Sequence, residues 1–248
     1  MRVAVLVSGR VDSAQGRKGL IRNNTRLKEK FPGADFYYGA WQSYKSEFDS
    51  VFPNETCEYF EEPVIHYHPY EISNKYHVNQ QYGSFAKGII KKASNREWTS
   101  HHTKQILIHA WLLDRIKKEY DVIIRTRFDA FIHRSADFTS YIADTFKENR
   151  ANCFATGRKQ SFAILYEQNK PTDNKAWHCF WDQLIIHPPR FITKQQVDHL
   201  HQEKMLHPAE FGWAQVLSYP YGLNHRAHKG WVNHDRNILD VFLKEEDK

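Results

Sequence analysis

The chain has 248 residues, of which 41% are hydrophobic and 15% aromatic, a composition typical of a folded protein and not of a disordered one. Its net charge of +6 favours a polyanionic partner such as a nucleotide diphosphate, a nucleic acid or an acidic glycan. No apolar run approaches the roughly 18 residues that a membrane span needs, so we expect a cytoplasmic protein. The three cysteines are scattered and indicate no disulfide framework. The length fits one α/β domain over residues 1–248.

The first elements along the chain form a predicted βαβ unit. A short apolar run predicts a strand at residues 3–7, an amphipathic stretch predicts a helix at 18–30, and an aromatic run predicts a strand at 35–41. A βαβ unit implies a parallel sheet. The pattern further predicts a short strand at 59–64 and a long excursion at 65–98 with a short helix near 85–93.

The middle of the chain joins an amphipathic helix to a buried strand. Apolar residues at spacings near 3.6 predict a helix over 104–119, and the apolar run that follows predicts a strand at 122–124 that is buried on both faces. Further runs predict strands at 153–156, 162–166 and 181–186 and helices at 195–205 and 209–217. The fold class is therefore α/β, with a mostly parallel central sheet flanked by helices.

Polar residues follow the predicted central strand at its carboxyl end. Arg125 and Arg127 alternate with Thr126, so both arginines are expected on one face, and Asp129 lies just past the strand. Ligands of open α/β sheets bind at this edge. A carboxylate there suits a divalent metal ion and arginines suit phosphate, although Asp129 could also serve only as the salt-bridge partner of the arginines.

The chain resembles the small viral and bacterial glycosyltransferase-like proteins of the GT-A fold, which are also Rossmann-like. The matching features are a helix with a glutamine, a Tyr-Asp pair before the central strand, an R-x-R-x-D strand end, a first strand that ends in Ser-Gly-Arg, a later Asp-Gln and a Glu-bearing helix start. They correspond to Gln105, Tyr120-Asp121, Arg125 to Asp129, Ser8-Gly9-Arg10, Asp182-Gln183 and Glu210.

This resemblance implies transfer of a sugar from a nucleotide-diphosphate sugar to a glycan or, given the basic charge, a nucleic-acid acceptor such as DNA. Ser8, Gly9, Arg10, Gln105, Arg125 and Arg127 would bind the donor. Asp129 would contact an Mg²⁺ or Mn²⁺ ion, with a carboxy-terminal histidine such as His228 as a further ligand. The family commonly carries Asp-x-Asp, whereas Asp129-Ala130-Phe131 offers one carboxylate, which leaves metal dependence open.

Two carboxylates are candidates for the chemistry on the acceptor. Inverting transfer needs a base that removes the proton of the acceptor hydroxyl. Asp182 has aromatic and apolar sequence neighbours, and desolvation there would raise its pKa towards the working range of a base. Glu210 lies in the first turn of a predicted helix, where an acid is also favoured by the helix dipole alone. We therefore expect Asp182 to be the base. Glu210 would bind a hydroxyl group of the acceptor or serve as the base in place of Asp182.

Two other functions fit the sequence. Ser8-Gly9 followed by Asp12-Ser13 resembles the PP-loop of ATP pyrophosphatases, but Arg10 stands where that loop needs a second glycine for its backbone to wrap a pyrophosphate. A nucleic-acid- or carbohydrate-binding module on a GT-A-like fold that has lost its catalytic residues is the alternative that is not an enzyme.

Overall fold

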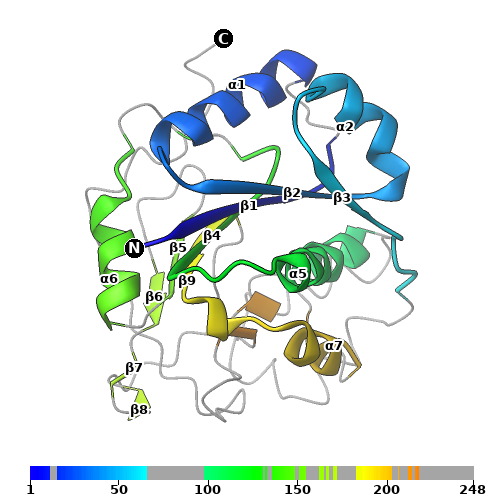
Figure 1. Cartoon of the computed structure of the whole chain (residues 1–248). Helices are drawn as coiled ribbons and strands as arrows, with labels where there is room; N and C mark the ends of the chain where they lie inside the picture. Colours follow the sequence, from blue (N-terminus) through cyan, green and yellow to red (C-terminus); the bar gives the residue numbers. More distant parts are fainter. Residues whose placement is uncertain are drawn as a thin grey trace, which may run out of the picture.

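A computed structural model describes residues 1–11, 16–65, 98–130, 132, 136–148, 151–154, 162–164, 166–167, 170–171, 183–202, 206, 212–213 and 216–217. Within these residues, seven strands form one sheet with helices on both faces (Figure 1). The elements are β1 (Val3–Gly9), α1 (Gly16–Lys30), β2 (Asp35–Trp41), η1 (Gln42–Tyr44), α2 (Lys45–Val51), β3 (Cys57–Phe60), α5 (Trp98–Arg115), β4 (Val122–Thr126), α6 (Thr139–Glu148), β5 (Ala151–Phe154), β6 (Phe162–Ile164), β7 (Tyr166–Glu167), β8 (Lys170–Pro171), β9 (Leu184–His187), η2 (Pro189–Phe191) and α7 (Lys194–Gln202).

The sheet has the strand order β3-β2-β1-β4-β9-β5-β6, and β7 and β8 form a separate hairpin. β1, β2, β3 and β4 are parallel, whereas β9 is antiparallel to both β4 and β5, and β6 is antiparallel to β5. The predicted α/β class with a mostly parallel sheet is confirmed. The prediction of one domain over residues 1–248 reaches beyond the described residues and stays a prediction.

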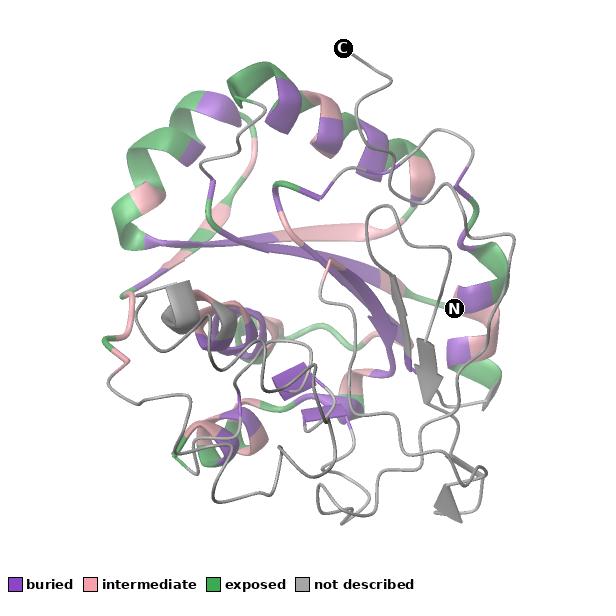
Figure 2. Ribbon diagram, turned by 180° about the vertical axis from the view of Figure 1, so that it is seen from behind, coloured by how far each residue is buried: buried purple, intermediate pink, exposed green. Residues whose placement is uncertain are grey.

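The two faces of the sheet bury different side chains because successive residues of a strand point to opposite sides. Val5 and Val7 of β1 pack with Ile124 of β4 beneath α1, α2 and the start of α6. Ala4 and Leu6 of β1 lie on the other face, against α5. Figure 2 shows the continuous buried layer that the central strands form between the helices. We call these two sides the α1 face and the α5 face.

The structure corrects the boundaries of the long helix. The sequence predicted 104–119, whereas α5 begins at Trp98 and ends at Arg115. The residues directly after Arg115 are not helical. Lys118 and the Tyr120 hydroxyl instead donate hydrogen bonds to the Asp35 carboxylate at the start of β2. The Asp121 carboxylate accepts the backbone N–H of Arg2 at 2.6 Å. These contacts hold the chain at the amino edge of the sheet and end the helical periodicity early.

Two helices had no counterpart in the sequence prediction. α2 has only Phe48 and Val51 as buried residues, so its amphipathic signal is short. At the start of α6, the Asp137 carboxylate accepts the backbone N–H of Thr139 at 2.9 Å. The predicted strand at 59–64 is β3 and ends at Phe60.

The remaining predictions are confirmed in part. The strands predicted at 153–156, 162–166 and 181–186 correspond to β5, β6 and β9, with shifted ends. The helix predicted at 195–205 is α7, while the helix predicted at 209–217 has helical backbone at the four residues described there. The helix predicted near 85–93 lies outside the described residues. No helix in the described part of the chain combines the length and the apolar character that crossing a membrane requires.

Candidate functional site

The sequence-predicted loops meet at one edge of the sheet, between β1 and β4. The chain runs outward from β1 to β2 and β3, then crosses to β4 on the other side of β1. The order of the strands therefore reverses between β1 and β4, and such a switch point opens a crevice at the carboxyl ends of the strands. The paired register of Val7 with Thr126 brings the Ser8-Gly9-Arg10 segment beside the Arg127-Phe128-Asp129 segment.

The end of β1 combines a buried hydroxyl group, a flexible backbone position and an exposed cation. Ser8 is completely buried, and among the described residues its Oγ has no hydrogen-bond partner. Gly9 has a φ of 125°, a backbone conformation that side chains disfavour, so glycine is required there. Arg10 is exposed, and its guanidinium lies 5.9 Å from the centroid of the Tyr44 ring, just past the end of β2. The sequence analysis did not identify Tyr44.

The segment after β4 is a turn with an ion pair on its outside. Arg127 donates from Nε to Oδ1 of Asp129 at 2.8 Å and from Nη2 to Oδ2 at 2.5 Å, so the guanidinium holds both carboxylate oxygens. Phe128 lies between them in the sequence and is buried beneath Tyr38 on the α1 face. The Asn23 side chain of α1 donates to the Phe128 carbonyl at 3.4 Å. Phe128 and Asn23 thus fix the turn that presents Arg127 and Asp129.

Arg125 has a different environment from Arg127. It is completely buried on the α5 face, where its Nη2 donates to Oε1 of Gln105 at 2.8 Å. Its guanidinium carbon lies 4.9 Å from the centroid of the Trp213 ring, a cation–π contact. Gln105 and Arg125, both predicted to bind a substrate, therefore bind each other. Their role towards a ligand stays a prediction.

A histidine pair lies beside Arg125. The His187 Nδ1 donates to the Pro188 carbonyl at 2.8 Å, which leaves its Nε2 as an acceptor for the Nε2–H of His109 at 3.2 Å. The pKa of His187 is lowered to about 4, mainly by burial and also by the charge of Arg125, while the bond to Pro188 opposes the shift. Burial, His187 and Arg125 also lower the pKa of His109. Both rings are therefore neutral at pH 7. The sequence analysis did not identify His109, although it lies four residues after Gln105 and therefore on the same face of the helix.

The other predicted site residues separate into two groups. Asp182, Glu210 and His228 lie outside the described residues, so their proposed roles as base, hydroxyl ligand and metal ligand stay predictions. Tyr120 and Asp121 of the resemblance have structural contacts at the amino edge of the sheet, opposite the candidate site.

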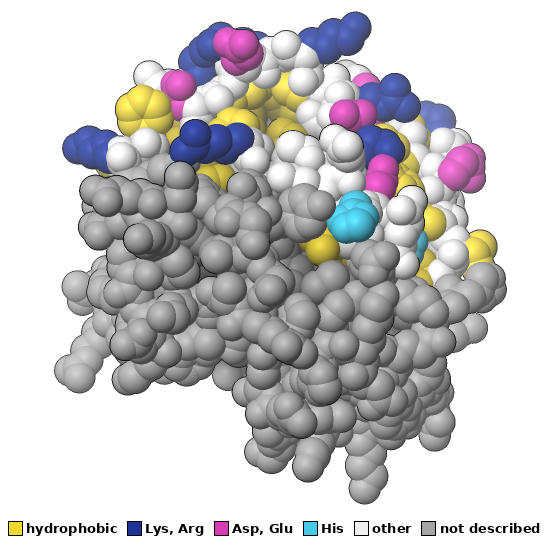
Figure 3. All heavy atoms as spheres, turned by 90° about the horizontal axis from the view of Figure 1, so that it is seen from below, with side chains coloured by type: hydrophobic (Ala, Val, Ile, Leu, Met, Phe, Trp, Pro, Cys, Tyr) yellow, Lys and Arg dark blue, Asp and Glu magenta, His cyan; other side chains and the backbone are white. Residues whose placement is uncertain are grey.

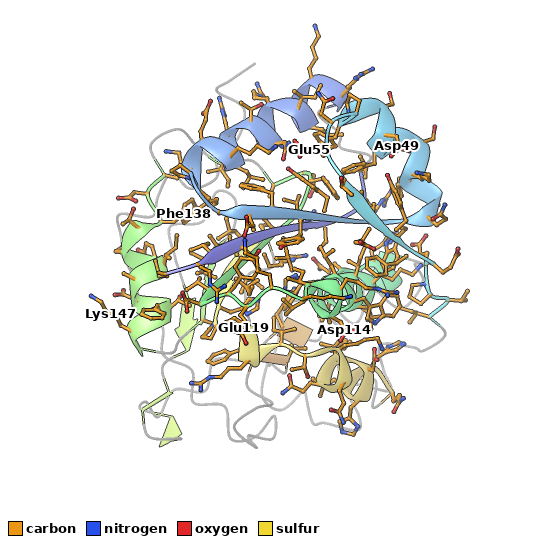
Figure 4. All side chains as sticks on the ribbon, viewed as in Figure 1. Asp49, Glu55, Asp114, Glu119, Phe138 and Lys147 are labelled. Carbon is orange, nitrogen blue, oxygen red and sulfur yellow. The ribbon has the colours of Figure 1, made fainter. Side chains whose placement is uncertain are left out.

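A cavity of about 510 Å³ also lies at that amino edge. Its charged lining residues are of both signs and include Arg2, Asp114, Glu119 and Lys194. Figure 4 shows Asp114 and Glu119 on the α5 side of the sheet, with Glu55 on the opposite side. On the one face that Figure 3 shows, acidic and basic side chains of the described residues are also interspersed. The described residues on that face and around this cavity therefore form no continuous basic surface for a polyanion.

Comparison with known proteins gives distant similarities in structure alone. No family model and no curated protein sequence matches the chain. A 4-diphosphocytidyl-2C-methyl-D-erythritol synthase from Anaerococcus prevotii is 8% identical, with a TM-score of 0.46 over 88% of this chain and 82% of that one. Core-mannan synthase A from Aspergillus fumigatus, solved in an Mn/GDP form, is 12% identical, with a TM-score of 0.42 over 94% and 74%. Mouse xyloside xylosyltransferase 1 is 12% identical, with a TM-score of 0.35 over 97% and 80%.

Proposed function

We propose that the chain is a glycosyltransferase that takes a sugar from a nucleotide-diphosphate sugar and passes it to a glycan. The observation that carries this proposal is the pairing of β1 with β4 at the switch point, which brings the Ser8-Gly9-Arg10 segment beside the Arg127-Phe128-Asp129 segment. In open α/β sheets, nucleotides bind at such a point. The Arg-x-Arg-x-Asp resemblance then favours a sugar nucleotide over other nucleotides.

The residues at this edge suit a diphosphate. Arg10 is exposed and Arg127 is partly exposed, and a planar guanidinium matches the oxygen spacing of phosphate. The absence of a side chain at Gly9 lets backbone amides approach an anion closely. The arginines would stabilise the negative charge that develops on the leaving nucleoside diphosphate. Asp182, with Glu210 as the alternative, would remove the proton of the acceptor hydroxyl.

While the Arg127–Asp129 ion pair is closed, the described residues do not fit a divalent metal ion at this edge. Asp129 is the carboxylate expected to hold it, and the guanidinium of Arg127 occupies both of its oxygens. Within the ranges described, no group of three or more histidine, cysteine or acidic side chains could hold a metal.

A ligand-binding screen tests the proposed function. UDP, GDP or dTDP sugars should raise the melting temperature, and a ligand at 100 times its dissociation constant should stabilise the fold by about 2.7 kcal/mol. Arg10→Met should weaken this binding, whereas Lys18→Met, which removes an exposed cation of α1, should not. Stabilisation by ATP with none by the sugar nucleotides would contradict the proposal and favour the pyrophosphatase alternative.

A second experiment tests the proposed base. Asp182→Asn keeps the shape of the side chain but cannot accept a proton, so turnover of the bound donor should fall by about 10² to 10⁴-fold with donor affinity unchanged. Glu210→Gln is the comparison, because an acid with only a helix-terminal role should cost stability and not turnover. The opposite pattern would exchange the two roles, and normal turnover in both variants would place the base elsewhere.

A further inference from the structure

After β4, the guanidinium of Arg127 forms a two-pronged anion-binding group, and the carboxylate of Asp129 already occupies it. Two parallel N–H···O bonds join Arg127 to Asp129, at 2.8 and 2.5 Å. This is the geometry with which arginine also binds phosphate. The side chains of Arg127 and Asp129 are 33% and 40% exposed, so a dissolved anion can reach the pair. A carboxylate of the chain itself therefore sits where a phosphate group would bind.

The turn that carries the pair is held independently of it. Ala130 donates its backbone N–H to the Arg127 carbonyl at 3.2 Å, and this bond closes the turn. Phe128 stacks on Tyr38 and Phe52, with ring centroids 6.3 and 6.0 Å away. The side chain of Asn23 adds its bond to the Phe128 carbonyl. Opening the ion pair does not require the turn to unfold, and Arg127 stays at the edge of the sheet when Asp129 releases it.

We propose that Asp129 is an internal competitor for the diphosphate group of the donor, and that binding exchanges the carboxylate of Asp129 for phosphate oxygens on Arg127. This inference rests on the proposed function for the identity of the ligand. In it, Arg127 supplies the positive charge that faces the diphosphate, and Asp129 weakens the binding of anions too poorly charged to displace it. The exchange is a specificity device, because a ligand with one negative charge competes less well than a diphosphate.

The energetics permit such an exchange. Partly exposed ion pairs contribute little to stability, since water screens the charges and two side chains must be ordered. A diphosphate brings more charge and more acceptor oxygens than a carboxylate and should win the competition. Removing the competing carboxylate should then tighten binding by about two- to five-fold, which corresponds to the usual range of coupling for such pairs.

The experiment measures the binding of inorganic pyrophosphate and of UDP and GDP by calorimetry, in buffer with EDTA and in buffer with Mn²⁺. Asp129→Asn should bind all diphosphates about two- to five-fold more tightly in EDTA. Arg127→Gln should bind them at least about ten-fold more weakly. The double variant should bind like Arg127→Gln alone, because Asp129 can compete only when Arg127 is present. Asp114→Asn removes the same charge at the opposite edge of the sheet and should leave binding unchanged.

Several outcomes separate the two proposals. The exchange would be overturned if Asp129→Asn bound diphosphates more weakly and lost an Mn²⁺ effect that the unmodified chain shows. Asp129 would then be a metal ligand. The exchange would also be overturned if Asp129→Asn tightened binding equally in the presence and in the absence of Arg127. The carboxylate of Asp129 would then act by general repulsion of the anion and not by competing for Arg127. If pyrophosphate obeys the expected pattern and nucleosides add no affinity, the exchange stands and the proposed function fails. If neither pyrophosphate nor a nucleotide binds, the exchange is wrong.

Discussion

The α1 face and the α5 face of the sheet both contain buried side chains, but their chemistry differs. Beneath α1 and α2, the carboxyl ends of the strands are covered by a cluster of aromatic rings. Against α5, the same depth of the sheet holds a cation, an amide and two neutral histidines. The aromatic cluster comprises Tyr38, Phe48, Phe52 and Phe128, and the polar cluster comprises Gln105, His109, Arg125, His187 and Trp213.

The comparison indicates that the two faces contribute differently to the candidate site. Aromatic packing gains free energy from burial and from the contacts between rings, and neither depends on pH near neutrality. Buried polar groups add little net stability, but they fix one arrangement because an unpaired partner is costly. We infer that the α1 face anchors the turn after β4, and that the α5 face fixes the orientation of Arg125 under the site.

The largest effect should come from breaking the aromatic side. Phe128→Ala removes a fully packed ring and should lower the free energy of unfolding by about 3–5 kcal/mol. Urea denaturation measures it. Phe146→Ala is the matched control, because that ring is 53% exposed on α6, and it should change stability by less than about 0.5 kcal/mol. Equal losses in the two variants would show that burial does not distinguish them and that the cluster is not the anchor.

Substitutions in the polar cluster of the α5 face should change the free energy of unfolding in a non-additive way. Gln105→Leu removes the amide oxygen that accepts the Nη2 bond of the buried Arg125 and should cost about 1.5–3 kcal/mol. Adding Arg125→Met should recover part of this loss, because the cation that lost its acceptor is then absent. The measurement is a double-mutant cycle of unfolding free energies. If the two losses simply add, the contact between Gln105 and Arg125 does not contribute to stability.

The sequence predicted three of the four parallel strands well because local signals determine them, whereas β3, predicted at 59–64, lies at Cys57–Phe60. The bounds of β2 agree with the predicted residues, and those of β1 and β4 extend them by two residues at the carboxyl end. Buried strands of a parallel sheet are short apolar runs, and such runs are visible without any partner. The loops at their carboxyl ends follow directly, which is why Gly9 and Asp129 could be identified as neighbours of a site.

The chemistry of the α5 face could not be predicted in the same way. Alternation placed Arg125 and Arg127 on one face, but it could not say that one would be buried against an amide and a tryptophan while the other would hold Asp129. The ion pair of Arg127 with Asp129 was one of the two roles that the sequence left open for Asp129, whereas the partners of Arg125 come from α5 and from residue 213, which are distant in sequence. His109 and His187 are 78 residues apart, and only the fold brings them together.

Between pH 7 and about pH 4, acid should destabilise the α5 face more than the α1 face. The folded pKa of His187 is about 4 and its reference value is 6.5, so below pH 6.5 the unfolded chain binds more protons and stability falls as pH drops from about 7 towards 4. For His187 alone, the loss between pH 8 and pH 5 should be about 2 kcal/mol. Urea denaturation at the two pH values measures it. His187→Gln should flatten this slope. An unchanged slope in His187→Gln would place the titrating group elsewhere.

The smallest effects should come from the helix starts on the two faces, which differ in their response to pH. At α7, Thr193 and Gln196 form a capping box: Oγ1 of Thr193 accepts the Gln196 N–H at 3.2 Å, and Oε1 of Gln196 accepts the Thr193 N–H at 2.9 Å. At α6, Asp137 accepts from Thr139, and this backbone bond lowers the pKa of Asp137.

Thr193→Ala and Asp137→Ala should each cost about 1 kcal/mol at pH 7, measured by urea denaturation. Because the folded pKa of Asp137 lies below the reference value of 3.8, its contribution is present above that pH and is lost as the pH falls through the folded value. The difference between the unmodified chain and Asp137→Ala should therefore shrink towards zero in acid, while that for Thr193→Ala should persist, since neither group of the capping box titrates. A loss for Asp137→Ala that stays constant down to pH 3 would mean that its carboxylate does not cap α6, and that the two faces do not differ at their helix starts.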